Sequence, residues 1–292
     1  MTGAPPGRAG AVNARDGQTT SDHAFPPWDL LWFRRFTPSA TARARLVCFP
    51  HAGGSASFYQ PVAAVLGPLA DVWAVQYPGR QDRRTEPGLT SIDALADAVV
   101  ARLRRPASGP PVAFLGHSMG AVVAHEVARR LVRLGEPGPA VLFVSGRRAP
   151  SIRREEPVHE GTDEDLLRAL AALSGTDRRI LDDEELQRMI LPAVRSDYLA
   201  IGRHRHLPGP PVPCPVVALT GDRDPHATVE DMRAWADHTT GGFELHVFPG
   251  GHFYLVDRAR EVLSVIANRI SHLLPGGASG AVQNDERVDP GS

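Results

Sequence analysis

The chain has 292 residues, 42% of them hydrophobic, and a formal net charge of -1. This length suits one large α/β domain or two small ones, and the composition is that of an ordinary soluble globular protein. The charge balance gives no sign of a nucleic-acid partner, and no apolar stretch approaches the roughly 18 residues of a membrane span. The N-terminus lacks the apolar core of a secretory signal, so we expect a cytoplasmic protein.

Short apolar runs alternate with helical patterns between two tails, 1–25 and 275–292, whose Gly, Pro and small polar residues predict disorder. Many runs consist almost entirely of Val, Leu, Phe and Ala, as is typical of strands buried on both faces of a parallel sheet. The alternation predicts a doubly wound α/β sheet. The predicted strands are 44–50, 72–77, 112–116, 140–145, 216–220 and 243–248, and the predicted helices are 56–66, 91–105, 119–134, 228–239 and 256–273.

Residues 155–207 interrupt this alternation, because no strand is predicted there. The stretches "DEDLLRALAALSG" and "DEELQRMILPAVRSDYLAIGRH" are amphipathic, and each opens with the acidic cluster that suits a helix N-terminus. A helical insertion between two strands of a sheet indicates a lid. Helices that only cover one sheet edge are the alternative. We therefore expect one domain over 26–274 with a helical lid at about 155–207.

The stretch "VAFLGHSMGAVVAHEVARRL" places G-x-S-x-G between a predicted buried strand and a predicted helix. In that context the pattern predicts a sharp turn that exposes the serine oxygen. Gly116 and Gly120 are required because side chains there would collide across the turn. Ser118 is therefore the predicted nucleophile; an inert serine in a tight turn is the alternative reading.

A catalytic serine needs a histidine base that an acid holds in place, and hydrolases with this turn order them Ser, Asp or Glu, then His. The last predicted strand ends in "FPGGHFYL", whose glycine loop carries His252. The strand before it ends in "TGDRDPHA", which offers Asp222 and Asp224. The last residue of such a G-x-x-D turn normally reaches the histidine, which favours Asp224. Asp222 stays open as the acid and would otherwise form the turn.

The stretch "LVCFPHAGGSASFY", residues 46–59, begins in the first predicted strand of the sheet and continues as the loop that follows it. Hydrolases place part of the oxyanion hole there, where backbone N–H groups stabilise the charged intermediate by about 3 kcal/mol each. We expect the two donors to be the N–H groups of Ala52 and Met119. A phosphate-binding loop is disfavoured because neither G-x-x-x-x-G-K-[ST] nor G-x-G-x-x-G occurs here. His51 is expected to shape the loop rather than to react.

Other candidate ligands give no metal or cofactor prediction. Cys48 and Cys214 lie in or beside apolar runs and are expected to be buried thiols, with neither a disulfide nor a metal inferred from them. The "HRH" stretch at 204–206 offers neighbouring residues that cannot readily converge on one ion.

Seven linked blocks resemble the type II thioesterases, the editing hydrolases that accompany modular polyketide and nonribosomal peptide synthases. The resemblance covers about residues 28–272, and "PGRQDR" and "SGRRAP" favour the polyketide branch. It implies the α/β-hydrolase fold, a triad of Ser118, Asp224 and His252, and an oxyanion hole at Ala52 and Met119. The blocks are "LVCFPHAGGSASFY", "VQYPGRQDRRTEP", "FLGHSMGA", "SGRRAP", "RSDYLA", "TGDRDP" and "GGHFYL".

The same resemblance implies a reaction and a partner. Members of the family hydrolyse aberrant or decarboxylated acyl groups from the phosphopantetheine arm of acyl carrier proteins, as monomers and without a cofactor. Carrier proteins are acidic, so an arginine-lined entrance is an attractive prediction, with ordinary solvated arginines as the alternative. The candidates are Arg147, Arg148, Arg153 and Arg154. For Arg80, Arg83 and Arg84, a turn closed by ion pairs competes with a binding role.

Two other functions stay open. A carboxylesterase, a lipase or a chain-terminating thioesterase could share this fold, and the fold alone does not separate them. A binding protein that kept a hydrolase fold without catalysis is the second alternative, and the complete set of Ser118, an aspartate, His252 and the glycine loop argues against it.

Overall fold

The structure is a computed structural model that describes residues 30–39, 41–103, 109–154, 161–173 and 183–274. The two predicted tails, 1–25 and 275–292, lie outside these ranges. Of the helices in the described ranges, none combines the length and the apolar character that a membrane span requires.

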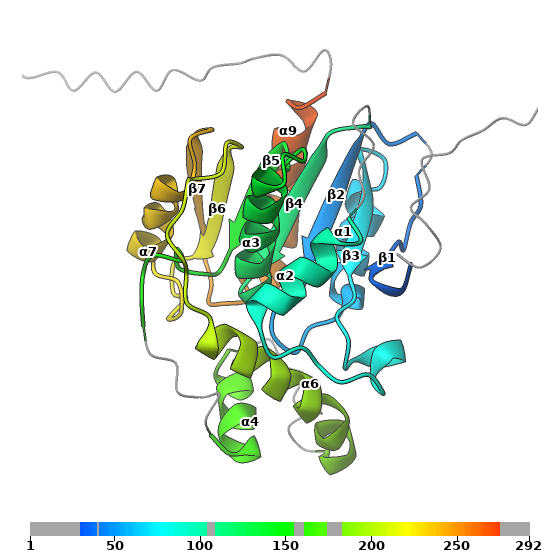
Figure 1. The fold of residues 1–292 in the computed structure, drawn as a ribbon, viewed down its shortest axis with the longest axis vertical. Helices are drawn as coiled ribbons and strands as arrows, with labels where there is room; N and C mark the ends of the chain where they lie inside the picture. The colour runs from blue at the N-terminus through cyan, green and yellow to red at the C-terminus, as the bar shows by residue number, and fades with distance from the viewer. Residues whose placement is uncertain (1–29, 40, 104–108, 155–160, 174–182, 275–292) are drawn as a thin grey trace, which may run out of the picture.

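A single seven-stranded sheet runs through the molecule in the order β1-β3-β2-β4-β5-β6-β7 (Figure 1). All neighbouring strands from β3 to β7 are parallel, and only β1 pairs in the antiparallel direction, with β3. The predicted, mostly parallel doubly wound sheet is therefore confirmed. The strands are β1 Phe33–Arg34, β2 Ala44–Phe49, β3 Ala70–Val75, β4 Val112–His117, β5 Val141–Ser145, β6 Val216–Gly221 and β7 Phe243–Phe248.

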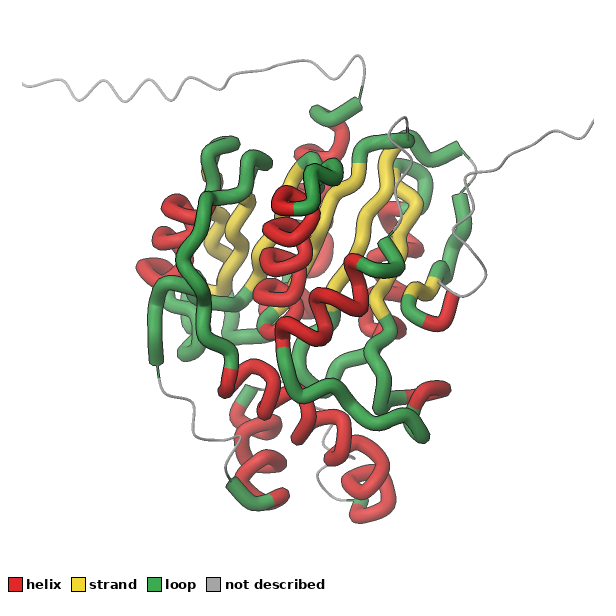
Figure 2. Tube along the Cα trace, viewed as in Figure 1, coloured by secondary structure: helices red, strands yellow, loops and turns green. Residues whose placement is uncertain are grey.

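Helices cover both faces of the sheet (Figure 2). Because side chains alternate between the faces of a strand, each inner strand contributes to two cores. In β2, Val47 and Phe49 face the core with α2, α3 and α7, whereas Leu46 and Cys48 face the core with α1 and α9. The helices are α1 Gln60–Leu66, α2 Ile92–Val100, α3 Met119–Arg133, α7 Val229–Arg233, α8 Tyr254–Asp257 and α9 Ala259–Ser271.

The structure differs from the predicted elements in a few places. The strand predicted at 72–77 is β3, which starts at Ala70 and ends at Val75. Its early start includes Asp71, a buried carboxylate that accepts hydrogen bonds from Trp73 and Arg35. The strand β1 was not predicted, because two residues carry no readable alternation. The helix predicted at 228–239 consists of α7 followed by a 3-10 helix, and that at 256–273 is divided into α8 and α9.

Two helices of the predicted insertion, α4 Asp163–Ala172 and α6 Glu184–Arg203, lie together at one end of the sheet (Figure 1). The side chains of Thr162 and Asp183 cap their N-termini, as the acidic openings of both runs suggested. The two helices share a small core of Leu166, Leu170 and Val194. A lid function for this segment stays a prediction.

Candidate active site

Ser118 lies in the turn between β4 and α3, at the carboxyl edge of the sheet. Its backbone has φ 54° and ψ -120°. Residues other than glycine rarely adopt this conformation, and those that do are found mostly at functional sites. The Ser118 N–H donates to the carbonyl of Ser145 at 2.8 Å. A side chain at Gly116 would overlap the backbone of Gly120, as the sequence pattern predicted.

His252 and Asp224 lie in contact after β7 and β6. Nδ1 of His252 is 2.8 Å from Oδ2 of Asp224, and the two residues are only 4% and 3% exposed. The other carboxylate oxygen of Asp224 accepts a hydrogen bond from the N–H of His226 at 2.9 Å. With both of its oxygens engaged, Asp224 can orient the imidazole ring and leave Nε2 available to a reacting group.

Asp222, the alternative candidate for the triad acid, makes a different contact. Its side chain is half exposed, and its Oδ1 accepts a hydrogen bond from the N–H of Gly250 at 2.8 Å. That bond, in the loop that leads to His252, lowers the pKa of the carboxyl group. Asp222 thus braces the glycine loop, whereas Asp224 contacts the ring of His252.

Ser118 directly follows His117 in the chain and makes no hydrogen bond with His252 among the described residues. The neighbouring ring of His117 packs against that of His252 with centroids 4.8 Å apart. Hydrogen bonds between a nucleophile and its base are often long before a substrate binds. The arrangement therefore suits a triad that closes when the substrate arrives.

A buried polar chain lies behind His252. Nδ1 of His117 is 2.9 Å from the hydroxyl of Ser145, which in turn is 2.7 Å from the hydroxyl of Tyr254. Burial, with a smaller effect of His252, lowers the pKa of His117 well below its usual value. His117 therefore stays neutral and adds no second positive charge beside His252 when that ring is protonated.

The loop after β2 packs directly onto the start of α3. A side chain at Gly120 would overlap the carbonyl oxygen of Phe49, so only glycine allows this approach. The predicted oxyanion donors come from these two segments. Met119 is the first residue of α3, where a helix leaves its N–H groups unpaired, and the Ala52 N–H makes no hydrogen bond with the described residues.

His51, in the same loop, packs rather than pairs. Its ring centroid lies 4.7 Å from that of Phe58 and 5.0 Å from that of Phe253. Burial, and then the neighbouring His252 and Arg80, lower the pKa of His51 to about 3. A base with so low a pKa takes up no proton near neutral pH, which agrees with the expectation that His51 shapes the loop.

Next to the site, Asp197 had no assigned role in the sequence, and Arg80 was left between an ion-paired turn and a binding role. Arg80 and Asp197 form a buried ion pair, with side chains 5% and 0% exposed. The carboxylate of Asp197 also accepts the Gly53 N–H at 2.8 Å, in the loop that carries Ala52. Both belong to quoted motifs, "PGRQDR" and "RSDYLA", but they are 117 positions apart and nothing in a single sequence pairs them.

The other arginine predictions have mixed outcomes. Arg148 is buried, so it does not line an open entrance, whereas Arg153 and Arg154 are exposed. Arg154 pairs with Asp231 at 2.7 Å. Arg83 pairs with Glu86 at 2.5 Å, the turn-closing role that was one alternative for this motif.

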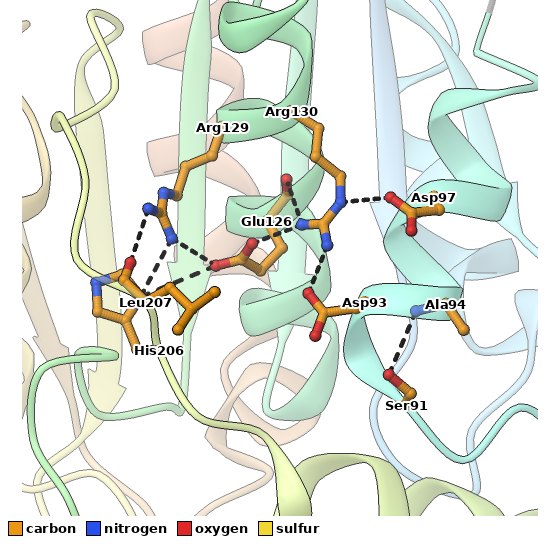
Figure 3. A network of polar contacts seen from close by, with 9 residues as sticks. All are labelled: Ser91, Asp93, Ala94, Asp97, Glu126, Arg129, Arg130, His206 and Leu207. Carbon is orange, nitrogen blue, oxygen red and sulfur yellow. Dashed lines mark hydrogen bonds and ion pairs between the residues drawn. The ribbon is translucent and has the colours of Figure 1, made fainter.

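One cluster has the residue types of a metal site. His125, Glu126 and His206 offer ligand atoms within 4.8 Å of one another, and Figure 3 shows two of them, Glu126 and His206, with the arginines beside them. Both carboxylate oxygens of Glu126 are already bound by guanidinium groups, one by Arg129 at 2.9 Å and the other by Arg130 at 2.5 Å. A cation there would face two fixed positive charges, so these residues are a poor fit for a metal. Cys48 and Cys214 are both buried free thiols.

Comparison with known proteins identifies the family. The model of the thioesterase domain matches residues 44–270. The chain belongs to the thioesterase family. Thioesterase PikA5 of Streptomyces venezuelae is 47% identical over 251 residues, which are 86% of this chain and 89% of that protein.

Solved thioesterase structures agree with this assignment. The type II thioesterase BorB from the borrelidin biosynthetic cluster has 48% sequence identity and a TM-score of 0.75, covering 82% of this chain and 98% of that chain. The thioesterase RedJ from the prodiginine pathway of Streptomyces coelicolor has 38% identity and a TM-score of 0.73, covering 79% and 87%. The predicted α/β-hydrolase fold, thioesterase activity and resemblance to type II thioesterases are thus confirmed.

Proposed function

We propose that this thioesterase is a type II editing enzyme of a polyketide pathway, which removes short aberrant acyl groups from the phosphopantetheine arm of acyl carrier proteins. The observation that carries the proposal is the buried contact of 2.8 Å between His252 and Asp224, at the same edge of the sheet as a serine with φ 54°. The similarity to PikA5 and to the type II enzyme BorB supports the biosynthetic setting.

In the proposed reaction Ser118 is the nucleophile and His252 the base. The Ser118 oxygen bonds to the thioester carbon while Nε2 of His252 takes the hydroxyl proton. The π-electron pair of the carbonyl moves to its oxygen, and the N–H groups of Ala52 and Met119 stabilise the resulting negative charge. When the C–S bond breaks, the thiolate leaves with the proton from His252, and the acyl group stays on Ser118 as an ester.

Deacylation repeats these steps with water. His252 takes a proton from the attacking water, the tetrahedral intermediate collapses, and Ser118 recovers its proton as the carboxylic acid departs. Asp224 stabilises the imidazolium form that occurs in each half of the cycle. These residues complete both half-reactions by acid–base and covalent catalysis alone.

The test is a time course of acyl release from a panel of acyl carrier proteins loaded with short chains, with simple esters of the same acids beside them. We expect faster turnover of the carrier-bound thioesters and no activity in the Ser118→Ala variant. Faster turnover of simple esters would assign the protein to another class of serine hydrolase, and full activity of Ser118→Ala would reject the mechanism.

A further inference from the structure

The buried carboxylate of Asp197, in the middle of α6, links this helix to the loop after β2. Its Oδ2 accepts hydrogen bonds from the N–H of Gly53 at 2.8 Å and from the Arg80 guanidinium at 2.7 Å. Its Oδ1 accepts a second Arg80 N–H at 2.8 Å. Such a bidentate ion pair fixes the orientation of the two side chains as well as the distance between them.

Arg80 holds the same loop from its other side. Its guanidinium donates to the carbonyl of Gly54 at 2.9 Å and lies 5.2 Å from the centre of the Tyr77 ring. Burial alone would lower the pKa of Arg80, but the charge and hydrogen bonds of Asp197 raise it, so the guanidinium keeps its positive charge. The N–H of Gly53 and the carbonyl of Gly54 are thus both bound to one buried ion pair.

The loop backbone at Gly53 lies so close to α6 that it has little room to change its conformation. Gly53 has φ +74°, and a side chain there would come within 2.9 Å of the Val194 methyl group on α6. The same stretch of α6 meets a second loop, because a side chain at Gly88 would overlap that of Ser196. The buried residues of α6 all lie from Ala193 onward, and Ala200 and Ile201 among them join the core on one face of the sheet.

We propose that Asp197 is a positioning residue for the oxyanion hole: by fixing the Gly53 N–H it sets the orientation of the adjoining Ala52 N–H toward the reacting carbonyl oxygen. The inference rests on the proposed function, which makes Ala52 an oxyanion donor. It also bears on the predicted lid: the half of α6 that follows Pro192 is part of the catalytic frame, and α4 packs onto this same half through Leu166, Leu170 and Val194.

A purely structural ion pair is the competing explanation, and the two make different predictions. A structural pair affects folding, whereas a positioning residue affects the transition state more than the bound substrate. Loss of a complete oxyanion donor lowers kcat by about 100- to 1000-fold in other enzymes. A misdirected donor should cost part of that, about 10- to 100-fold.

The test compares Asp197→Asn and the double variant Arg80→Met/Asp197→Leu with the wild type. The double variant keeps the fold testable, since apolar replacement of both partners of a buried pair is often neutral for stability. For each protein we would measure kcat and KM with a short acyl carrier protein thioester. We would also measure inhibition by a short alkyl trifluoromethyl ketone, which adds to the serine as a charged tetrahedral adduct.

Glu126→Gln is the matched control, because Glu126 also forms a buried ion pair, on α3 with Arg129 and Arg130 (Figure 3). We expect the Asp197 variants to lose about 10- to 100-fold in kcat with KM within about threefold. Inhibition by the ketone should weaken by the same factor as kcat/KM. Glu126→Gln should lower the melting temperature and leave kcat unchanged.

Folded Asp197 variants with wild-type kcat would overturn the inference, as would a loss of kcat without weaker ketone binding. Either result, combined with an inactive Ser118→Ala enzyme, would leave the proposed function standing and reject only the role of Asp197. An active Ser118→Ala enzyme would reject the proposed function itself.

Discussion

Asp222 accepts a hydrogen bond from the backbone N–H of Gly250, while Asp224, two residues later, contacts the ring of His252. Two carboxylates of one turn therefore act on the same glycine loop in different ways. The first fixes the path of the chain, and the second orients the histidine.

Exchange of each aspartate for asparagine separates these two roles. We expect Asp224→Asn to lower kcat by about 10³- to 10⁴-fold, because an amide can donate to Nδ1 and stabilise the wrong tautomer. Asp222→Asn should lose less than about fivefold, since its carbonyl oxygen can still accept the Gly250 N–H. Steady-state kinetics on one thioester decides between them. Equal losses in both variants would contradict the division of roles.

Gly120, after the nucleophile, and Gly251, before the histidine, should differ in how much a side chain at each position destabilises the protein. Gly120→Ala places a methyl group on the Phe49 carbonyl, a backbone atom that cannot rotate away, and should destabilise the protein by about 3 kcal/mol or more. Gly251→Ala meets nothing within 4 Å and should leave the free energy of unfolding nearly unchanged. Denaturant unfolding measures both. A stable Gly120→Ala protein would mean that the loop after β2 does not pack as described.

Buried neutral histidines predict a loss of stability in acid. Burial, with a smaller effect of His206, lowers the pKa of His238 to about 4, against about 6.5 in the unfolded chain. Between these values only the unfolded chain carries the proton, so the free energy of unfolding rises with pH in this window and falls as the pH drops toward 4. One such group contributes a slope of at most about 1.4 kcal/mol per pH unit.

His238→Gln tests this contribution, because glutamine cannot take up the proton. Urea unfolding between pH 7 and pH 4.5 should give a shallower pH dependence for the variant than for the wild type. Parallel curves would show that His238 titrates alike in the folded and unfolded states.

The polar chain behind His252 can be shortened by one hydroxyl. Tyr254→Phe keeps the ring stacked on Phe248, whose centroid lies 5.4 Å away, and removes the partner of Ser145. We expect the free energy of unfolding to fall by about 1–2 kcal/mol, the usual effect of losing a buried hydrogen bond. Tyr254→Ala should cost about 3–5 kcal/mol, because the ring is lost as well. No difference between Tyr254→Phe and wild type would show that the hydroxyl is not bound.

Much of the fold could be predicted because its strands are buried on both faces. The apolar runs that became β4 and β5 have little polarity to obscure them, and each ends close to its predicted limit. The strand β3 was less clear because the buried charge of Asp71 lies inside it. The hydrogen bonds that Asp71 accepts from Trp73 and Arg35 stabilise this charge inside the strand, and a single sequence does not reveal such partners.

The candidate site was likewise predictable only in part. Ser118, Asp224 and His252 follow strand ends, and parallel strands bring such residues to one edge of a sheet. Asp197 lies in a helix of the insertion, and its contacts with Gly53 and Arg80 join positions more than 100 residues apart. Local periodicity predicts the helix and its buried side, but not the loop that this side contacts.

The most direct test of the proposed mechanism is the mass of the intact protein, quenched within the first turnovers after mixing with a short acyl carrier protein thioester. A transient mass increase equal to the acyl group less one hydrogen is expected on the peptide that contains Ser118, and no such increase is expected in Ser118→Ala. Turnover without such an adduct in the wild type and at undiminished rate in Ser118→Ala, or an adduct on another residue, would contradict the mechanism.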